Sequence, residues 1–158
     1  MQVKKIQVKW QMKSEILSGI LWIEARALKR LMKQEIRTEK APKAIGPYSQ
    51  GILSKGSILY VSGQLPVDPQ TGEFPAESIE QQTRQSLENI KAILQGADLG
   101  MEHVVKTTVL LADIADFGAM NAVYGTYFAE PFPARAAFEV GALPKGARVE
   151  IEVVAVKE

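Results

Sequence analysis

Hydrophobic and polar residues alternate strictly near the start of the chain. Between positions 5 and 13 every second residue is apolar, a period of two that predicts a strand with one buried face. Ser14 then offers a helix N-cap, and apolar residues recur every three or four positions as far as about Gln34. This spacing predicts an amphipathic helix. Because such a strand–helix unit cannot bury its own apolar face, residues 1–34 are expected to form a packing or assembly arm.

From about residue 35 the pattern changes to short strands separated by two helices. Apolar runs on either side of residues 54–56 predict a β-hairpin, with Gly56 supplying a positive φ. Apolar residues at helical spacing follow Ser78 as far as 96–100, and they recur from Ile114 to Phe128. The strands are expected at 52–53, 57–62, 104–111, 134–140 and 149–156. Two helices on one face of a mixed sheet make this body an α+β domain.

Charge separates the arm from the body. The chain has 158 residues and a net charge of +1, with 46% hydrophobic and 23% charged residues, which excludes a disordered or fibrous protein. Residues 1–40 carry ten Lys and Arg against four Asp and Glu (+6), whereas the rest of the chain carries −5. A basic arm therefore precedes a mildly acidic body. We expect two units, an extension at 1–34 and a domain at 35–158.

The arm fits neither a membrane span nor a targeting sequence well. Its apolar run at 16–23 has eight residues, far short of the roughly 20 that a transmembrane helix needs. A mitochondrial presequence is basic and amphipathic but poor in acids, and Glu15, Glu24 and Glu35 disfavour it. Its basic residues are better explained as a solvated face than as a nucleic-acid patch. We expect neither a membrane nor a nucleic acid as partner.

Several kinds of chemistry are excluded or weakly supported. The chain has no cysteine, which rules out disulfides and thiolate sites and suits a reducing cytoplasm, where we expect the protein to reside. The single histidine, His103, stands beside Glu102 just before an expected strand, and we expect it to be exposed or to cap a turn. Neither a glycine-rich nucleotide motif nor metal-ligand spacing occurs. No metal or organic cofactor is expected.

Two charged residues stand in otherwise apolar strands. Arg135 lies among small residues, where a long cation either ends in a salt bridge or awaits an anion. A small carboxylate would suit it, because the guanidinium fork matches two carboxylate oxygens. Glu150 is expected to share one strand face with Glu152. Such a carboxylate usually faces solvent, and only a specific environment would make it a base.

Seven segments of the body carry a recognisable pattern. They are AIGPYSQ at 44–50, VSGQLPVD at 61–68, QQTRQSLEN at 81–89, VKTTV at 105–109, NAVY at 121–124, PAR at 133–135 and VEIE at 149–152. In this order and spacing they resemble the Rid (YjgF) family of reactive-intermediate deaminases, over about residues 35–157. The resemblance implies a chorismate-mutase-like α+β fold, a homotrimer around a β-sheet barrel, and sites in the clefts between subunits. The arm has no counterpart in the family pattern.

The resemblance also implies an activity and its residues. Archetypal members hydrolyse 2-imino acids, such as 2-iminobutanoate and 2-iminopropanoate, to 2-keto acids and ammonia without a cofactor. Carried onto this sequence, Arg135 would bind the substrate carboxylate and Glu150 would activate the attacking water. The positions expected to line the cleft are Tyr48, Ser62, Gly63, Asn121 and Ala137. Ala137 stands where many relatives have cysteine, so that only its backbone N–H can serve.

Two other interpretations remain open. The body could be a trimeric scaffold or binding module, natural or engineered as a component of a larger symmetric assembly built through the arm, because a second interface on a cyclic oligomer generates higher symmetry. Nucleic-acid binding or RNA cleavage has been attached to some relatives. The acidic body argues against it, since strong binding to phosphates needs a basic surface.

Overall fold

A computed structural model describes residues 33–75 and 77–157, in which six strands and two α-helices form. The first two strands, β1 (Lys33–Ile36) and β2 (Gly51–Ser54), pair as an antiparallel ribbon. The other strands form one sheet in the order β3 (Ser57–Gln64), β6 (Val149–Lys157), β4 (Val104–Leu111) and β5 (Ala134–Glu139). β3 and β4 both run antiparallel to β6, whereas β4 and β5 are parallel. The sheet is therefore mixed.

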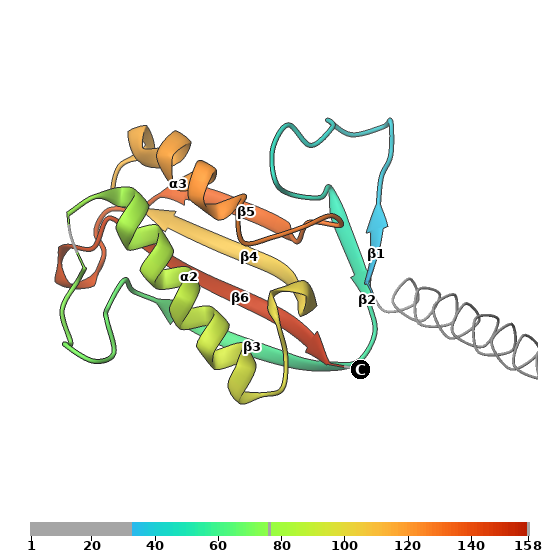
Figure 1. Cartoon of the computed structure of the whole chain (residues 1–158). Coiled ribbons are helices and arrows are strands. Elements are labelled where there is room, and N and C mark those ends of the chain that lie inside the picture. The colour runs from blue at the N-terminus through green and yellow to red at the C-terminus, as the bar shows by residue number, and fades with distance from the viewer. Residues whose placement is uncertain (1–32, 76, 158) are drawn as a thin grey trace, which may run out of the picture. The chain divides into compact units, whose positions relative to one another are not determined.

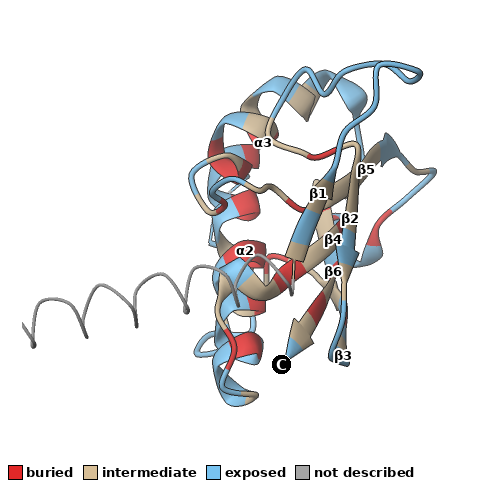
Figure 2. Cartoon of the chain, turned by 90° about the vertical axis from the view of Figure 1, so that its right-hand side faces the viewer, coloured by how far each residue is buried: buried red, intermediate tan, exposed pale blue. Residues whose placement is uncertain are grey.

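Both helices cover the same face of this sheet, as the two views show (Figures 1 and 2). Helix α2 (Ile79–Gly96) connects β3 to β4, and α3 (Phe117–Tyr124) connects β4 to β5. We call the covered side the helix face of the sheet and the other side its open face. The expected α+β arrangement, with two helices on one face of a mixed sheet, is confirmed.

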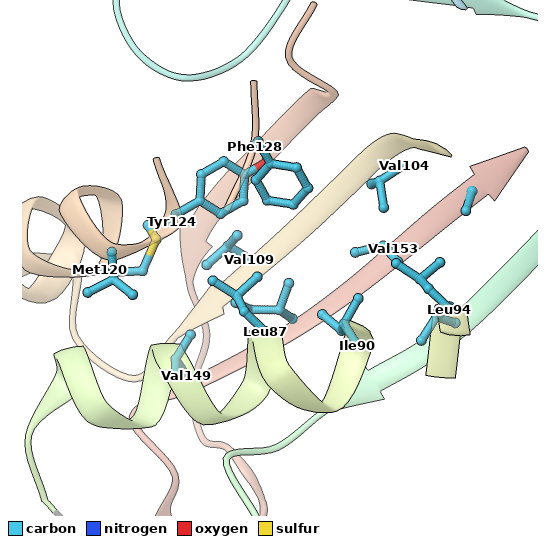
Figure 3. Close-up of a cluster of buried hydrophobic side chains, with 14 of the residues drawn as sticks. Leu87, Ile90, Leu94, Val104, Val109, Met120, Tyr124, Phe128, Val149 and Val153 are labelled. Atoms are coloured by element: carbon cyan, nitrogen blue, oxygen red, sulfur yellow. The ribbon is translucent and has the colours of Figure 1, made fainter. Parts of the chain in front are cut away.

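The core lies between α2, α3 and the helix face (Figure 3). Ser78 precedes α2, and the residues expected to trace its apolar stripe are all buried: Ile79, Thr83, Leu87, Ile90 and Leu94. Along β6 the burial alternates, with Val149, Ile151 and Val153 buried and the glutamates between them directed to the open face. None of the described helices is long and apolar enough to cross a membrane.

The expected β-hairpin is wrong. Gly56 does have a positive φ of 145°, but β2 pairs with β1 and β3 pairs with β6. The chain therefore passes from one sheet to the other at this turn. A Cβ added at Gly56 would collide with the backbone carbonyl of Lys157, so the close approach of β6 accounts for the glycine. Local turn chemistry identified the turn and could not identify the partners of its flanking strands.

Two other element boundaries also differ from expectation. The second helix begins with a 3-10 turn, Ile114–Asp116, and α3 itself ends at Tyr124, so that Phe128 lies beyond it. Phe128 is nevertheless buried, with its ring centroid 4.6 Å from that of Tyr124, which explains why its position matched a helical period. At the other end, Lys33 and Gln34 belong to β1 rather than to the expected helix. The rest of the arm, residues 1–32, lies outside the described residues, and its role in assembly stays a prediction.

Candidate active site

Arg135 lies on β5 and points to the helix face. It is the parallel partner of Thr107 on β4, and the Thr107 hydroxyl forms a hydrogen bond with Tyr124 of α3. The Arg135 side chain follows the same direction, because its Nη1 donates a hydrogen bond of 2.7 Å to Oδ1 of Asn121, also on α3. Two expected site residues, Arg135 and Asn121, are thus brought together.

Three aromatic rings surround the guanidinium of Arg135. Its Cζ lies 4.7 Å from the ring centroid of Tyr124, 5.4 Å from that of Tyr48 and 5.6 Å from that of Phe117. Burial lowers the pKa of Arg135. Within the described residues Arg135 forms no ion pair with a carboxylate. The cation is half-buried and lacks a counter-charge, which leaves it able to receive an anion.

Tyr48 reaches Arg135 because the loop that carries it is tied to the start of β5. The next residue, Ser49, is 3% exposed. Its N–H donates to the carbonyl of Pro133 at 3.1 Å and its hydroxyl donates to the carbonyl of Phe132 at 2.6 Å. Ser49 also forms a bridge with Ala134, directly before Arg135. The loop that carries Tyr48 is therefore held at one defined place.

The same loop forms part of the wall of an open recess of about 400 Å³ next to Tyr48. The side chain of Gln50 shapes it: Oε1 accepts from the N–H of Thr38 at 2.7 Å, and Nε2 donates to the carbonyls of Thr38, Ala41 and Pro42 at 3.1, 3.2 and 2.7 Å. The wall of the recess includes Tyr48 and Phe132 together with charged side chains of both signs. Arg135 is not among the residues that line this recess, which therefore lies beside the ring of Tyr48 and not around the guanidinium.

Glu150 lies on the open face, on the other side of the sheet from Arg135. It is half-buried on β6 and pairs with Leu110, one residue from the buried Val109. Next to it, β3 has a register shift between Val61 and Gln64, where Ser62 and Gly63 together oppose one residue of β6. A Cβ at Gly63 would collide with the Glu150 carboxylate. This bulge therefore brings Gly63 directly against Glu150.

The expected site residues fall into two groups. Tyr48, Asn121 and Arg135 meet at the helix face, and Ala137, two residues further along β5, packs against the core on that side. Glu150 and Gly63 lie together on the open face, with the exposed Ser62 beside them. Arg135 pairs with Thr107 and Glu150 pairs with Leu110, and these β4 residues are three positions apart, so the two side chains point to opposite faces of the sheet. The expected site residues of one chain therefore lie in two separate places, one on each face of the sheet.

Sequence reasoning missed Phe117 and Tyr124, which it assigned only to the apolar stripe of a helix. Phe117, Asn121 and Tyr124 follow one another at intervals of four and three along α3, which places them on one helix face. The asparagine between two aromatic residues was the available signal. The stripe contributes to the core and also forms the surroundings of Arg135.

His103 caps a turn, which is one of the two roles expected for it. Its Nδ1 accepts a hydrogen bond of 2.9 Å from the N–H of Gly100 and so caps the turn before β4. In the described ranges, no group of three or more His, Asp and Glu side chains is arranged to hold a metal ion.

Comparison with known proteins agrees with this architecture. The family model described as Endoribonuclease L-PSP matches residues 38–157. A RutC family protein of Pyrococcus horikoshii is 54% identical over 127 residues, which cover 80% of this chain and all of that protein. The human protein named 2-iminobutanoate/2-iminopropanoate deaminase is 50% identical, over 80% of this chain and 92% of its own length.

Solved structures give the same result. The YjgF gene product from E. coli has a TM-score of 0.61 and 48% identity, covering 79% of this chain and 99% of that chain. TdcF from E. coli, solved with bound serine, has a TM-score of 0.61 and 46% identity, covering 80% of this chain and all of the other. With the family model matched across the body and relatives at about 50% identity, the chain belongs to the Rid (YjgF) family.

Proposed function

We propose that this protein hydrolyses 2-imino acids to 2-keto acids and ammonia. The observation that carries the proposal is the half-buried guanidinium of Arg135, which is surrounded by aromatic rings and lacks a carboxylate partner in the described part of the chain. Relatives at about 50% identity named 2-iminobutanoate/2-iminopropanoate deaminase support it. The human and goat proteins each match this chain over 127 residues, which is 80% of its length.

Arg135 binds the carboxylate of the substrate. One of its N–H groups donates to Asn121, and the remaining donors can form a fork for two carboxylate oxygens. The E. coli relative solved with serine supports a ligand of this size and kind, because serine carries a carboxylate next to its amine-bearing carbon. Fixing the carboxylate also restricts the position of the C=N group, because the imine carbon is bonded directly to the carboxylate carbon.

Glu150 activates the water. A water oxygen adds to the carbon of the protonated imine while the Glu150 carboxylate takes one of its protons. The carboxyl group then returns that proton to nitrogen, the C–N bond breaks, and the hydroxyl proton leaves with nitrogen as ammonium. One water is consumed and a 2-keto acid remains. Since the imine carbon is already electrophilic, holding both reactants in position supplies much of the rate.

Each site is completed by two copies of the chain in a homotrimer. Arg135 and Glu150 point to opposite faces of one sheet, so the Arg135 group of one copy has to meet the Glu150 group of the next. The open face supports such an assembly, because it exposes Ile58, Tyr60 and Phe138 by 55%, 74% and 46%. A monomer rarely leaves an apolar surface of this kind uncovered. The proposed trimer buries it in a β-sheet barrel.

Mixing two inactive variants tests the shared site. Arg135→Ala and Glu150→Gln each remove one half, and co-expression of the two chains creates some clefts that hold both intact halves. With random assembly, roughly a quarter of the clefts are intact, and a similar share of the parental activity is expected. Each variant assembled alone is the control. Mixed trimers that remain as inactive as either variant would show that one chain supplies both residues.

Replacing Gly63 tests the placement of Glu150. The added methyl group of Gly63→Ala collides with the carboxylate, and we expect kcat to fall roughly ten- to a hundredfold because the water is no longer held in line. Gly96→Ala, at the end of α2, is the matched control, since its Cβ meets nothing within 4 Å. Steady-state kinetics and thermal unfolding of both variants are measured. Unchanged kcat in Gly63→Ala contradicts the proposed role of Glu150.

Hydrolysis of an imine is favoured over RNA cleavage, although the family model carries an endoribonuclease description. Histidine is the most frequent acid–base residue in proton transfer, and the one histidine of this chain is engaged as a turn cap. The guanidinium of Arg135, which has no carboxylate partner among the described residues, and the glutamate proposed to lie across the cleft suit a small carboxylate-bearing substrate.

A further inference from the structure

Phe117 and Tyr124 are two aromatic neighbours of Arg135 that were not among the expected site residues. They lie on α3 with Asn121 between them, and their rings face the guanidinium at 5.6 and 4.7 Å. A ring face attracts a cation through its quadrupole, without accepting a hydrogen bond along an N–H direction. The rings therefore hold the guanidinium and leave its donors available. A carboxylate in their place would neutralise the charge and occupy the fork.

Tyr124 is itself fixed from two sides. Its hydroxyl and that of Thr107 lie 2.8 Å apart, and both residues are fully buried. Its ring also packs against Phe128, with the planes tilted by 38° (Figure 3). Burial raises the pKa of Tyr124 to about 12, so the phenol is neutral near pH 7 and the contact with Arg135 is one between a cation and a ring.

The strand pairing links this ring to the guanidinium. Thr107 is the β4 partner of Arg135 on β5, and Thr107 also binds the Tyr124 hydroxyl. The pairing of Thr107 with Arg135 thus determines the position of the guanidinium and, through the Thr107 hydroxyl, that of the Tyr124 ring. The side chain of Arg135 has many rotamers, and the surrounding rings reduce the number that it can adopt.

We infer that Phe117 and Tyr124 are positioning residues, which orient the Arg135 guanidinium for the substrate carboxylate. This inference rests on the proposed function and goes beyond it by adding two residues that act through Arg135. Their effect belongs to binding rather than to the chemical step. Loss of a ring should therefore weaken carboxylate binding and raise KM, with little change in kcat.

Phe117→Leu is the main test, because Phe117 is only partly buried and leucine keeps an apolar side chain there. We expect the Kd for 2-oxobutanoate, measured by calorimetry, and the KM for the imine to rise about fivefold, the size of one partly desolvated cation–π contact. kcat should change less than about twofold. Phe117→Tyr restores a ring and should bind within about twofold of the parent.

Controls separate positioning from stability. Met101 is also partly buried against the core but lies outside the ring cluster, so Met101→Ala should lower the Tm without raising the Kd. A parent that binds 2-oxobutanoate and a Phe117→Leu variant that binds it equally well overturn the inference alone. A parent that neither binds it nor hydrolyses the imine overturns the proposed function as well.

Discussion

Arg135→Ala is expected to lower kcat/KM for 2-iminobutanoate by about 10² to 10³-fold, the effect of losing a desolvated, charge-assisted pair of hydrogen bonds. The guanidinium has no other carboxylate to bind in the described part of the chain, and its loss leaves the substrate carboxylate without a counter-charge. The measurement is a coupled assay in which a threonine dehydratase supplies the imine. The rate of 2-keto acid formation above the uncatalysed rate gives the activity.

Arg135→Lys separates charge from geometry. Lysine keeps the positive charge but replaces the planar fork with a point charge, which cannot bind two oxygens side by side or stack on three rings in the same way. We expect it to recover less than about a tenth of the parental kcat/KM. An Arg135→Ala variant that clears 2-iminobutanoate as fast as the parent would remove the main support for the proposed function.

Glu150→Gln is expected to reduce kcat by about 10² to 10⁴-fold, the range for loss of a general base. Glutamine has nearly the same shape as glutamate but accepts no proton at neutral pH, so the water is held and not activated. Binding of 2-oxobutanoate should stay within about twofold of the parent, because in the proposed site Arg135 and not Glu150 binds the carboxylate. Single-turnover kinetics and calorimetry measure the two quantities separately.

Glu152→Gln is the matched control for this change. Glu152 lies two residues along β6 on the same face as Glu150 and is exposed, and it carries the same charge. If its replacement leaves kcat within about twofold of the parent, general loss of negative charge from the open face is not the cause. An active Glu150→Gln variant would assign water activation to another group.

Sequence alone could predict much of the body because several elements are set by local pattern. The period of α2, its Ser78 start and its glycine end are sufficient for the helix, and β4 occupies the predicted range Val104–Leu111. The alternation along β6 placed the glutamates on the face opposite the buried valines. These features depend on neighbours within a few residues, which the sequence displays directly.

Other features depend on partners distant in sequence. The partner of β2 is β1, which the charge and periodicity of the arm concealed. The family pattern grouped seven site residues in one cleft, but it did not show that Arg135 and Glu150 point to opposite faces of the sheet. That division follows from the register of β4 with both of its neighbours. The contacts of Phe117 and Tyr124 with Arg135 were likewise not visible in the sequence. An aromatic residue on the buried face of a helix occurs at the same spacing whether or not it also contacts a cation.

The bulge in β3 contains a residue that strand pairing does not need. Val61 pairs with Val153 and Gln64 pairs with Ile151, so the ladder on either side would still align if the segment were one residue shorter. The surplus residue is unnecessary for pairing, and it places a bare Cα where a regular strand would present a side chain. Under the proposed mechanism, the close approach of Gly63 to Glu150 should constrain the length of this stretch and its glycine during evolution, whereas strand pairing and packing should constrain the valines around it.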